Sequence, residues 1–202
     1  YADTTLGAGR PFAANLVHAG AVFGAGVEVG VFKFASVQAE GLLSGDGSSV
    51  SAGGMVGVTA YPLPASFPLK LALSAGYLRE LGQSDGAWGR VTLAGDVGPV
   101  RLVLMGLGSH IFAPDRDAID LLVSTGATVK VVSFLRVGAE YVVQDLEGAW
   151  EGEEEEAEGG VRHFLSPMAS LDLGRVRLTA GPAFGLSPDS PRVLGRLQAG
   201  YS

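Results

Sequence analysis

The sequence predicts an all-β fold over residues 1–202: one antiparallel up-and-down sheet that closes into a transmembrane β-barrel of 12 strands, with 10 strands as the alternative. Three observations predict this fold. Apolar and polar residues alternate along many segments, these segments are longer than the strands of most soluble proteins, and the connections between them are alternately long and short.

The alternation has a period of two residues, which is typical of a strand with one apolar and one polar face. In "LKLALSAGY", residues 69–77, Leu71 and Leu73 share one parity while Lys70 and Ser74 share the other. Ten segments of about 9 to 13 residues repeat this design, close to the 9 to 11 residues that a tilted strand needs to cross a bilayer. The predicted strands are 33–43, 50–60, 69–77, 89–97, 100–109, 118–130, 135–144, 163–173, 174–186 and 192–201.

The connections between these segments differ in length and polarity. In an up-and-down meander, successive connections lie at opposite ends of the sheet, so one end here carries long polar loops and the other carries short turns. This asymmetry is typical of bacterial outer-membrane barrels. The long polar connections are 44–49, 79–88, 113–117, 146–162 and 187–191, and the alternates include the tight turns at 98–99 and 174 and the proline-rich "YPLPASFP", residues 61–68.

The polar parity of the strands determines what the barrel interior contains. In a membrane barrel the apolar parity contacts lipid and the polar parity lines the lumen, whereas a soluble barrel has the opposite orientation. Strand length and loop asymmetry favour the membrane orientation, with the soluble barrel as the alternative. The polar residues that we expect to face the lumen are Lys70, Arg90, Arg101, Asp120, Lys130, Arg136, Glu140, Arg177, Arg196 and Gln198.

The strand number depends on residues 1–32. Ten strands from residue 33 onward return the chain to the end at which it started, so residues 1–32 supply either no strand or two strands. Val27, Val29 and Val31, with Glu28 between them, indicate the end of a descending strand. We therefore predict 12 strands.

Composition and charge restrict the function classes. Hydrophobic residues make up 47% of the chain and charged residues 17%, and there are 31 glycines and no cysteine. The net charge of −7 and the absence of a basic cluster argue against nucleic-acid binding. Much of the excess acid lies in one predicted external loop, which we interpret as solvated and which could also collect cations; its residues are Glu151, Glu153, Glu154, Glu155, Glu156 and Glu158.

The chain resembles the bacterial outer-membrane β-barrel class. The resemblance covers residues 33–202 and rests on segments such as "LKLALSAGY" and "LRVGAEYVVQ", on the loop asymmetry and on the final "RLQAGY". Such barrels typically end on an aromatic residue, whereas here Tyr201 is followed by Ser202. The resemblance implies a location in the bacterial outer membrane, with membrane lipid and other envelope proteins as partners.

Candidate catalytic and metal-binding residues are few. Ser109 and His110 are adjacent and therefore point to opposite faces of a strand, which excludes a nucleophile–base pair between them. His110 could still act with Asp115 or Asp117 at the outer rim, and His163 begins the predicted strand 163–173, next to another long loop. Together with His18, the three histidines lack metal-ligand spacing. We therefore predict no catalytic residue, metal or cofactor. The expected function is a narrow pore or a structural scaffold. The alternatives are a subunit of a larger envelope assembly and a protease or lipid-modifying enzyme of the outer rim.

Overall fold

The computed structural model describes residues 21–45, 50–64, 66–80, 84–113, 119–149, 161–188, 190 and 192–201. These residues form eleven β-strands and one short 3-10 helix. No helix among them is long and apolar enough to cross a membrane. The elements are β1 (Ala21–Phe32), β2 (Ala35–Gly45), β3 (Val50–Ala60), β4 (Leu69–Glu80), β5 (Asp85–Val97), β6 (Val100–Ile111), β7 (Asp120–Val132), β8 (Leu135–Gln144), η2 (Leu146–Ala149), β9 (Arg162–Leu173), β10 (Val176–Gly185) and β11 (Val193–Tyr201).

The strands form one sheet in which each strand pairs antiparallel with the next, in the order β1 to β11. This confirms the predicted all-β, antiparallel up-and-down sheet, and β2 to β11 correspond to the ten predicted strands. Because β1 precedes them, the ten-strand alternative is wrong. The predicted twelfth strand would have to lie in residues 1–20, which are outside the described residues, and no β1–β11 pairing closes the described sheet.

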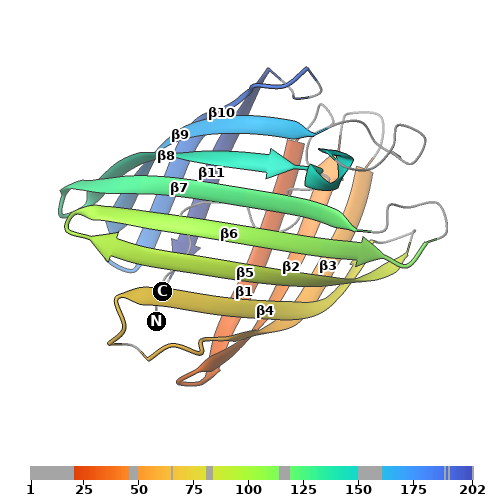
Figure 1. Cartoon of the computed structure of the whole chain (residues 1–202), viewed down its shortest axis with the longest axis horizontal. Coiled ribbons are helices and arrows are strands. Elements are labelled where there is room, and N and C mark those ends of the chain that lie inside the picture. The colour runs from red at the N-terminus through yellow and green to blue at the C-terminus, as the bar shows by residue number, and fades with distance from the viewer. Residues whose placement is uncertain are drawn as a thin grey trace.

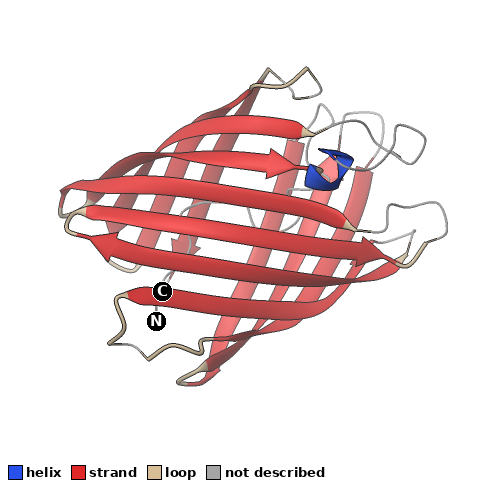
Figure 2. Ribbon diagram, viewed as in Figure 1, coloured by secondary structure: helices blue, strands red, loops and turns tan. Residues whose placement is uncertain are grey.

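The connections differ between the two ends of the sheet, as Figures 1 and 2 show. The turns at 98–99 and 174–175 each join neighbouring strands through two residues, and Gly98 and Gly174 adopt positive φ angles of 59° and 72°. Such angles suit glycine because it has no Cβ. We call this end, which also carries residues 33–34, 61–68 and 133–134, the short-turn end, and the opposite end the long-loop end.

The sheet has one buried and one exposed face. In β9, Phe164, Ser166 and Met168 are buried, whereas Leu165 and Pro167 between them are exposed. No second sheet and no helix longer than η2 covers the buried face within the described residues. The sheet instead curls over itself, so that β1–β3 lie behind β5–β7 in Figure 1. We call the buried face concave and the exposed face convex.

The convex face is apolar. Along β5 and its neighbours, Leu73, Val91 and Leu104 are all exposed, and the same parity is exposed throughout the sheet. The soluble-barrel alternative predicted the opposite orientation, with the apolar parity inside. Further exposed strand residues of this face are Val27, Val29, Val37, Val56, Val58, Leu69, Leu102, Val129, Val137, Leu165, Leu171, Val176, Val193 and Leu197.

Pro182, an awkward residue in a paired strand, faces a second proline. The β9–β10 pairing runs from Val176↔Leu173 to Ala180↔Ala169 and resumes at Phe184↔Leu165, so the same register places Pro182 opposite Pro167. Neither residue has an N–H, and the ladder is interrupted there. Ser166 compensates, since its hydroxyl donates to the Pro182 carbonyl at 2.9 Å. The break therefore leaves this carbonyl satisfied.

Candidate functional site on the concave face

The residues of the concave face fall into three levels along the strands. Near the short-turn end, charged residues face one another across neighbouring strands. A belt of hydroxyl and amide groups follows, and an apolar cluster occupies the part nearer the long-loop end. The site is built from many strands because each strand contributes one inward residue in every two.

The charged level contains two cross-strand ion pairs. Arg101 lies opposite Asp96, with its Nε and Nη2 atoms 2.9 and 3.1 Å from the two carboxylate oxygens. Arg177 lies opposite Asp172 and donates to its carboxylate. Both pairs are partly exposed, so each contributes little to stability.

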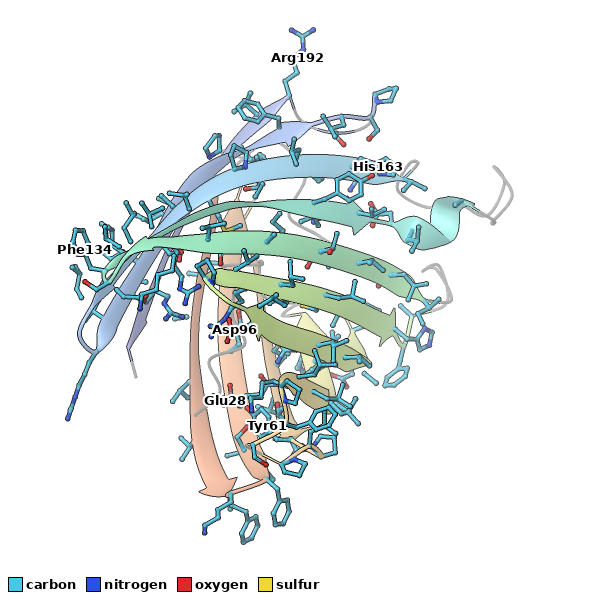
Figure 3. All side chains as sticks on the ribbon, turned by 60° about the vertical axis from the view of Figure 1, so that its left-hand side comes forward. Glu28, Tyr61, Asp96, Phe134, His163 and Arg192 are labelled. Atoms are coloured by element: carbon cyan, nitrogen blue, oxygen red, sulfur yellow. The ribbon has the colours of Figure 1, made fainter. Side chains whose placement is uncertain are left out.

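Glu28 accepts hydrogen bonds at the same end of the sheet, and Tyr61 lies beside it in Figure 3. The Tyr61 hydroxyl donates to the Glu28 carboxylate at 2.5 Å, and the Ser36 hydroxyl donates to the same oxygen. Burial, together with the hydrogen bond to Glu28, raises the pKa of Tyr61 to about 12. Tyr61 is therefore a neutral hydrogen-bond donor at physiological pH.

Arg90 organises the middle belt. Its Nη2 atom donates to Gln38 Oε1 at 3.1 Å and approaches the Ser74 hydroxyl at 3.4 Å. Ser74 and Thr59 share a hydrogen bond of 2.9 Å. The guanidinium carbon of Arg90 lies 5.7 Å from the centre of the Trp88 ring, a cation–π contact that links this belt to the apolar level.

Sequence reasoning did not predict the apolar cluster inside the sheet. Trp88 and Phe164, two aromatic residues toward the long-loop end, are each 4% exposed and face the concave side. The cluster draws on eight strands, and its buried members are Met55, Leu78, Trp88, Met105, Leu107, Ile111, Leu122, Val142, Phe164 and Ala183.

An ion pair lies beside this cluster at the start of β9. Arg162 Nη1 is 3.0 Å from Asp145 Oδ2, and the Arg162 side chain is only 5% exposed. Asp145 follows β8 with a φ of 52°, a conformation that aspartate tolerates better than most residues. The nearby Glu140 and Gln144 are also buried. The interior therefore contains charged groups at both ends.

The structure describes the side chains of eight of the ten residues that were predicted to face the lumen. Lys70, Arg90, Arg101, Asp120, Lys130, Arg136, Glu140 and Arg177 lie on the parity of the concave face, and Lys130 is exposed at its edge. The backbones of Arg196 and Gln198 pair with Gly181 and Thr179, but their side chains are outside the described part of the chain. The acidic loop, residues 151–160, is outside it as well.

The structure places three of the residues that the sequence offered for chemistry, Ser109, His110 and His163. Ser109 faces inward, with its hydroxyl 3.4 Å from Asp120, while His110 packs edge-on against Phe112. His163 accepts or donates a 2.7 Å hydrogen bond with the Tyr141 hydroxyl. Among the described residues no group of three or more histidine, cysteine or acidic side chains could hold a metal. Asp115, Asp117 and His18 are outside those residues.

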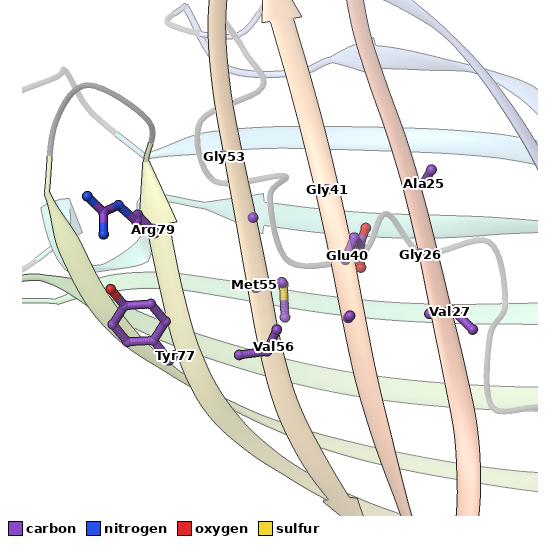
Figure 4. Close-up of a pocket in the computed structure, with 12 residues that line it drawn as sticks. Ala25, Gly26, Val27, Glu40, Gly41, Gly53, Met55, Val56, Tyr77 and Arg79 are labelled. Carbon is purple, nitrogen blue, oxygen red and sulfur yellow. The ribbon is translucent and has the colours of Figure 1, made fainter.

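A shallow hollow of about 730 Å³ lies over β1–β4, where small residues line the wall (Figure 4). Ala25, Gly41 and Gly54 occupy one cross-strand row of it, with Tyr77 and Arg79 on the β4 side. Its lining is almost entirely apolar, which does not indicate a polar ligand.

Comparisons with protein-family models, curated proteins and solved structures find no match for this chain.

Proposed function

We propose that the chain is a bacterial outer-membrane β-barrel whose convex face contacts lipid and whose interior forms a narrow pore or the filling of a structural scaffold. The observation that carries the proposal is the orientation of the sheet. Large apolar side chains are exposed along every strand from β1 to β11, while the polar parity is turned inward. Soluble monomers rarely expose an apolar surface of this extent.

Charge is placed on the convex face as a bilayer requires. Among the described strand residues, the Asp, Glu, Lys and Arg side chains of this parity are Arg79 and Asp85, and its histidines are His110 and His163, also toward the long-loop end. Arg79 and Asp85 lie opposite each other at the long-loop end, with Arg79 Nε 3.6 Å from Asp85 Oδ1. The long middle stretch of the face carries no such charge, which supports contact with hydrocarbon.

Aromatic residues lie near both ends of this apolar face. Phe32 and Phe34 stack with ring centres 5.5 Å apart at the short-turn end, where Phe134 is also exposed. Tyr77 and Tyr141 lie toward the other end. Phe134 and Tyr141 are separated by roughly 23 Å along the strand, which corresponds to about 18 Å along the barrel axis if the strands tilt by about 40°. The presence of exposed aromatic residues at two separate levels of the face supports an interface at each end of a bilayer.

Closure of the sheet follows from the membrane location, because lipid cannot satisfy the backbone groups of an open edge. β1 and β11 both run toward the short-turn end, so direct pairing between them would be parallel. The twelfth strand predicted from the sequence would lie between them and make every pair antiparallel, which matches the even strand number of single-chain outer-membrane barrels.

The side chains that occupy the interior support a narrow pore and not an open channel. The apolar cluster draws side chains from eight strands, and the ion pairs narrow the short-turn end. We expect the purified protein to float with lipid vesicles and to give small or undetectable conductance in planar bilayers. A large, weakly selective open channel would contradict the filled interior, and failure to float would contradict the membrane location.

A further inference from the structure

Four inward-facing side chains form a compact patch near the short-turn end. Arg101 of β6 lies opposite Thr128 of β7, and Lys130 of β7 lies opposite Arg136 of β8. Thr128 and Lys130 are two residues apart and share a face, so the four positions occupy adjoining places on three neighbouring strands. We call these residues the basic patch.

The pairing of Lys130 with Arg136 is electrostatically unfavourable. Like charges directly opposite each other on neighbouring strands destabilise a sheet, since their Cβ atoms are about 5 Å apart. Strands usually avoid this arrangement or place an opposite charge beside it. A negatively charged ligand between the two side chains would turn this repulsion into attraction.

Two polar atoms of the patch also lack a partner. Thr128 Oγ1 and Arg136 Nη1 are buried and make no hydrogen bond with any described residue, and Thr128 is only 2% exposed. A buried donor that is left unsatisfied is costly, so such groups normally bind water or a ligand. Thr128 lies opposite Gly138 and Lys130 opposite Arg136, so Thr128 and Arg136 are diagonal neighbours on the same face. A hydroxyl and a guanidinium N–H in such neighbouring positions can both donate to one oxyanion.

The neighbouring carboxylates do not neutralise the patch. Asp96 pairs with Arg101 and also lies within electrostatic reach of Arg136, while Asp172 pairs with Arg177. Lys70 and Glu28 also lie at this end, so the charged level of the described concave face has five basic and three acidic side chains, a net charge of 5 − 3 = +2. Lys130 is exposed, so solutes can reach the patch from the short-turn end.

We propose that the basic patch binds a tetrahedral oxyanion of the phosphate class. One oxygen accepts from Arg136 Nη1 and another from the Thr128 hydroxyl, while Lys130 and Arg101 balance the charge. A phosphate meets the two unpartnered donors with separate oxygens and carries up to two negative charges, whereas chloride offers one acceptor atom and a single charge. The site requires only the concave face of the sheet, so it stands independently of the membrane location.

Titration of the folded protein with inorganic phosphate, followed by calorimetry, tests this site. We expect saturable binding, with chloride at equal ionic strength failing to compete. Arg136→Gln should weaken binding about tenfold or more, and Arg136→Lys should weaken it less, because the charge is retained. Thr128→Val keeps the side-chain shape and should weaken binding about twofold to tenfold through loss of the hydroxyl.

Lys33→Gln is the matched control. Lys33 lies in the exposed turn between β1 and β2 at the same end, so its loss changes the net charge equally without touching the patch. It should leave phosphate affinity within about twofold, as expected for a screened surface charge. If Lys33→Gln and Arg136→Gln weakened phosphate binding equally, long-range attraction alone would explain the binding, and the proposed site would be overturned. No saturable binding by the folded wild-type protein would overturn it as well.

Discussion

Replacing Val91 by arginine tests whether lipid or water surrounds the convex face. Val91 is the middle residue of β5, lies opposite Leu73 and is 51% exposed. Val97, at the short-turn end of the same strand and on the same face, is 70% exposed. The two valines therefore differ mainly in their depth along the sheet.

The expected costs follow from that depth. Six residues separate the two valines, which corresponds to about 20 Å along the strand and roughly 15 Å along the axis at a tilt near 40°. Arginine on a lipid-facing surface costs about 2–4 kcal/mol at the bilayer midplane and about 0–1 kcal/mol near the interface. Val91→Arg should therefore lower the ratio of folded to unfolded protein roughly thirtyfold to several hundredfold, and Val97→Arg by less than about fivefold.

Reversible folding into lipid vesicles under a urea gradient measures these costs. The free energy of unfolding should fall for Val91→Arg and change little for Val97→Arg. If water surrounded the convex face, both substitutions would place an arginine at an exposed position and neither would matter much. Equal free energies of unfolding for the two variants would therefore refute the lipid contact.

Two further predictions concern local structure. A Cβ at Gly181 would lie 2.1 Å from the Pro167 carbonyl oxygen, so Gly181→Ala should destabilise the fold by about 1–3 kcal/mol. A Cβ at Gly195 would have no atom within 4 Å, so Gly195→Ala should leave the stability unchanged. Equal urea midpoints for the two variants would contradict the close approach of β9 and β10. The pKa of Tyr61, about 12 in the fold against an ordinary value of 10, means that the fold favours the neutral hydroxyl. This contribution to stability is present below pH 10 and is lost as the pH rises toward 12, and Tyr61→Phe should remove that dependence. An ultraviolet titration in which Tyr61 ionises near pH 10 would contradict the burial of Tyr61 together with its hydrogen bond to Glu28.

Much of the fold could be predicted because a strand side chain has a period of two. The ten segments defined by alternation became β2 to β11 with ends that shifted by a few residues. The partner of Pro182 was also within reach: the tight turn at Gly174 fixes Leu173 opposite Val176, and counting outward from that pair places Pro167 opposite Pro182.

The concave site was harder to predict because it depends on contacts across many strands. β6 carries apolar residues on both parities, so alternation could not reveal that Met105 and Leu107 belong to an interior cluster. Trp88 could have been placed correctly by parity, since it lies two residues before Arg90. The opposition of Lys130 and Arg136 depends on the register of the β7–β8 hairpin, which shifts between Lys130 and Val132.

The most direct test of the membrane-barrel account is the electrophoretic mobility of the detergent-folded protein before and after boiling. A closed membrane barrel resists unfolding by the detergent of the gel, because every backbone group within it is paired. We therefore predict a band that migrates differently without boiling and moves to the position of the unfolded chain after boiling. A water-soluble protein whose mobility is the same in both lanes would contradict the account.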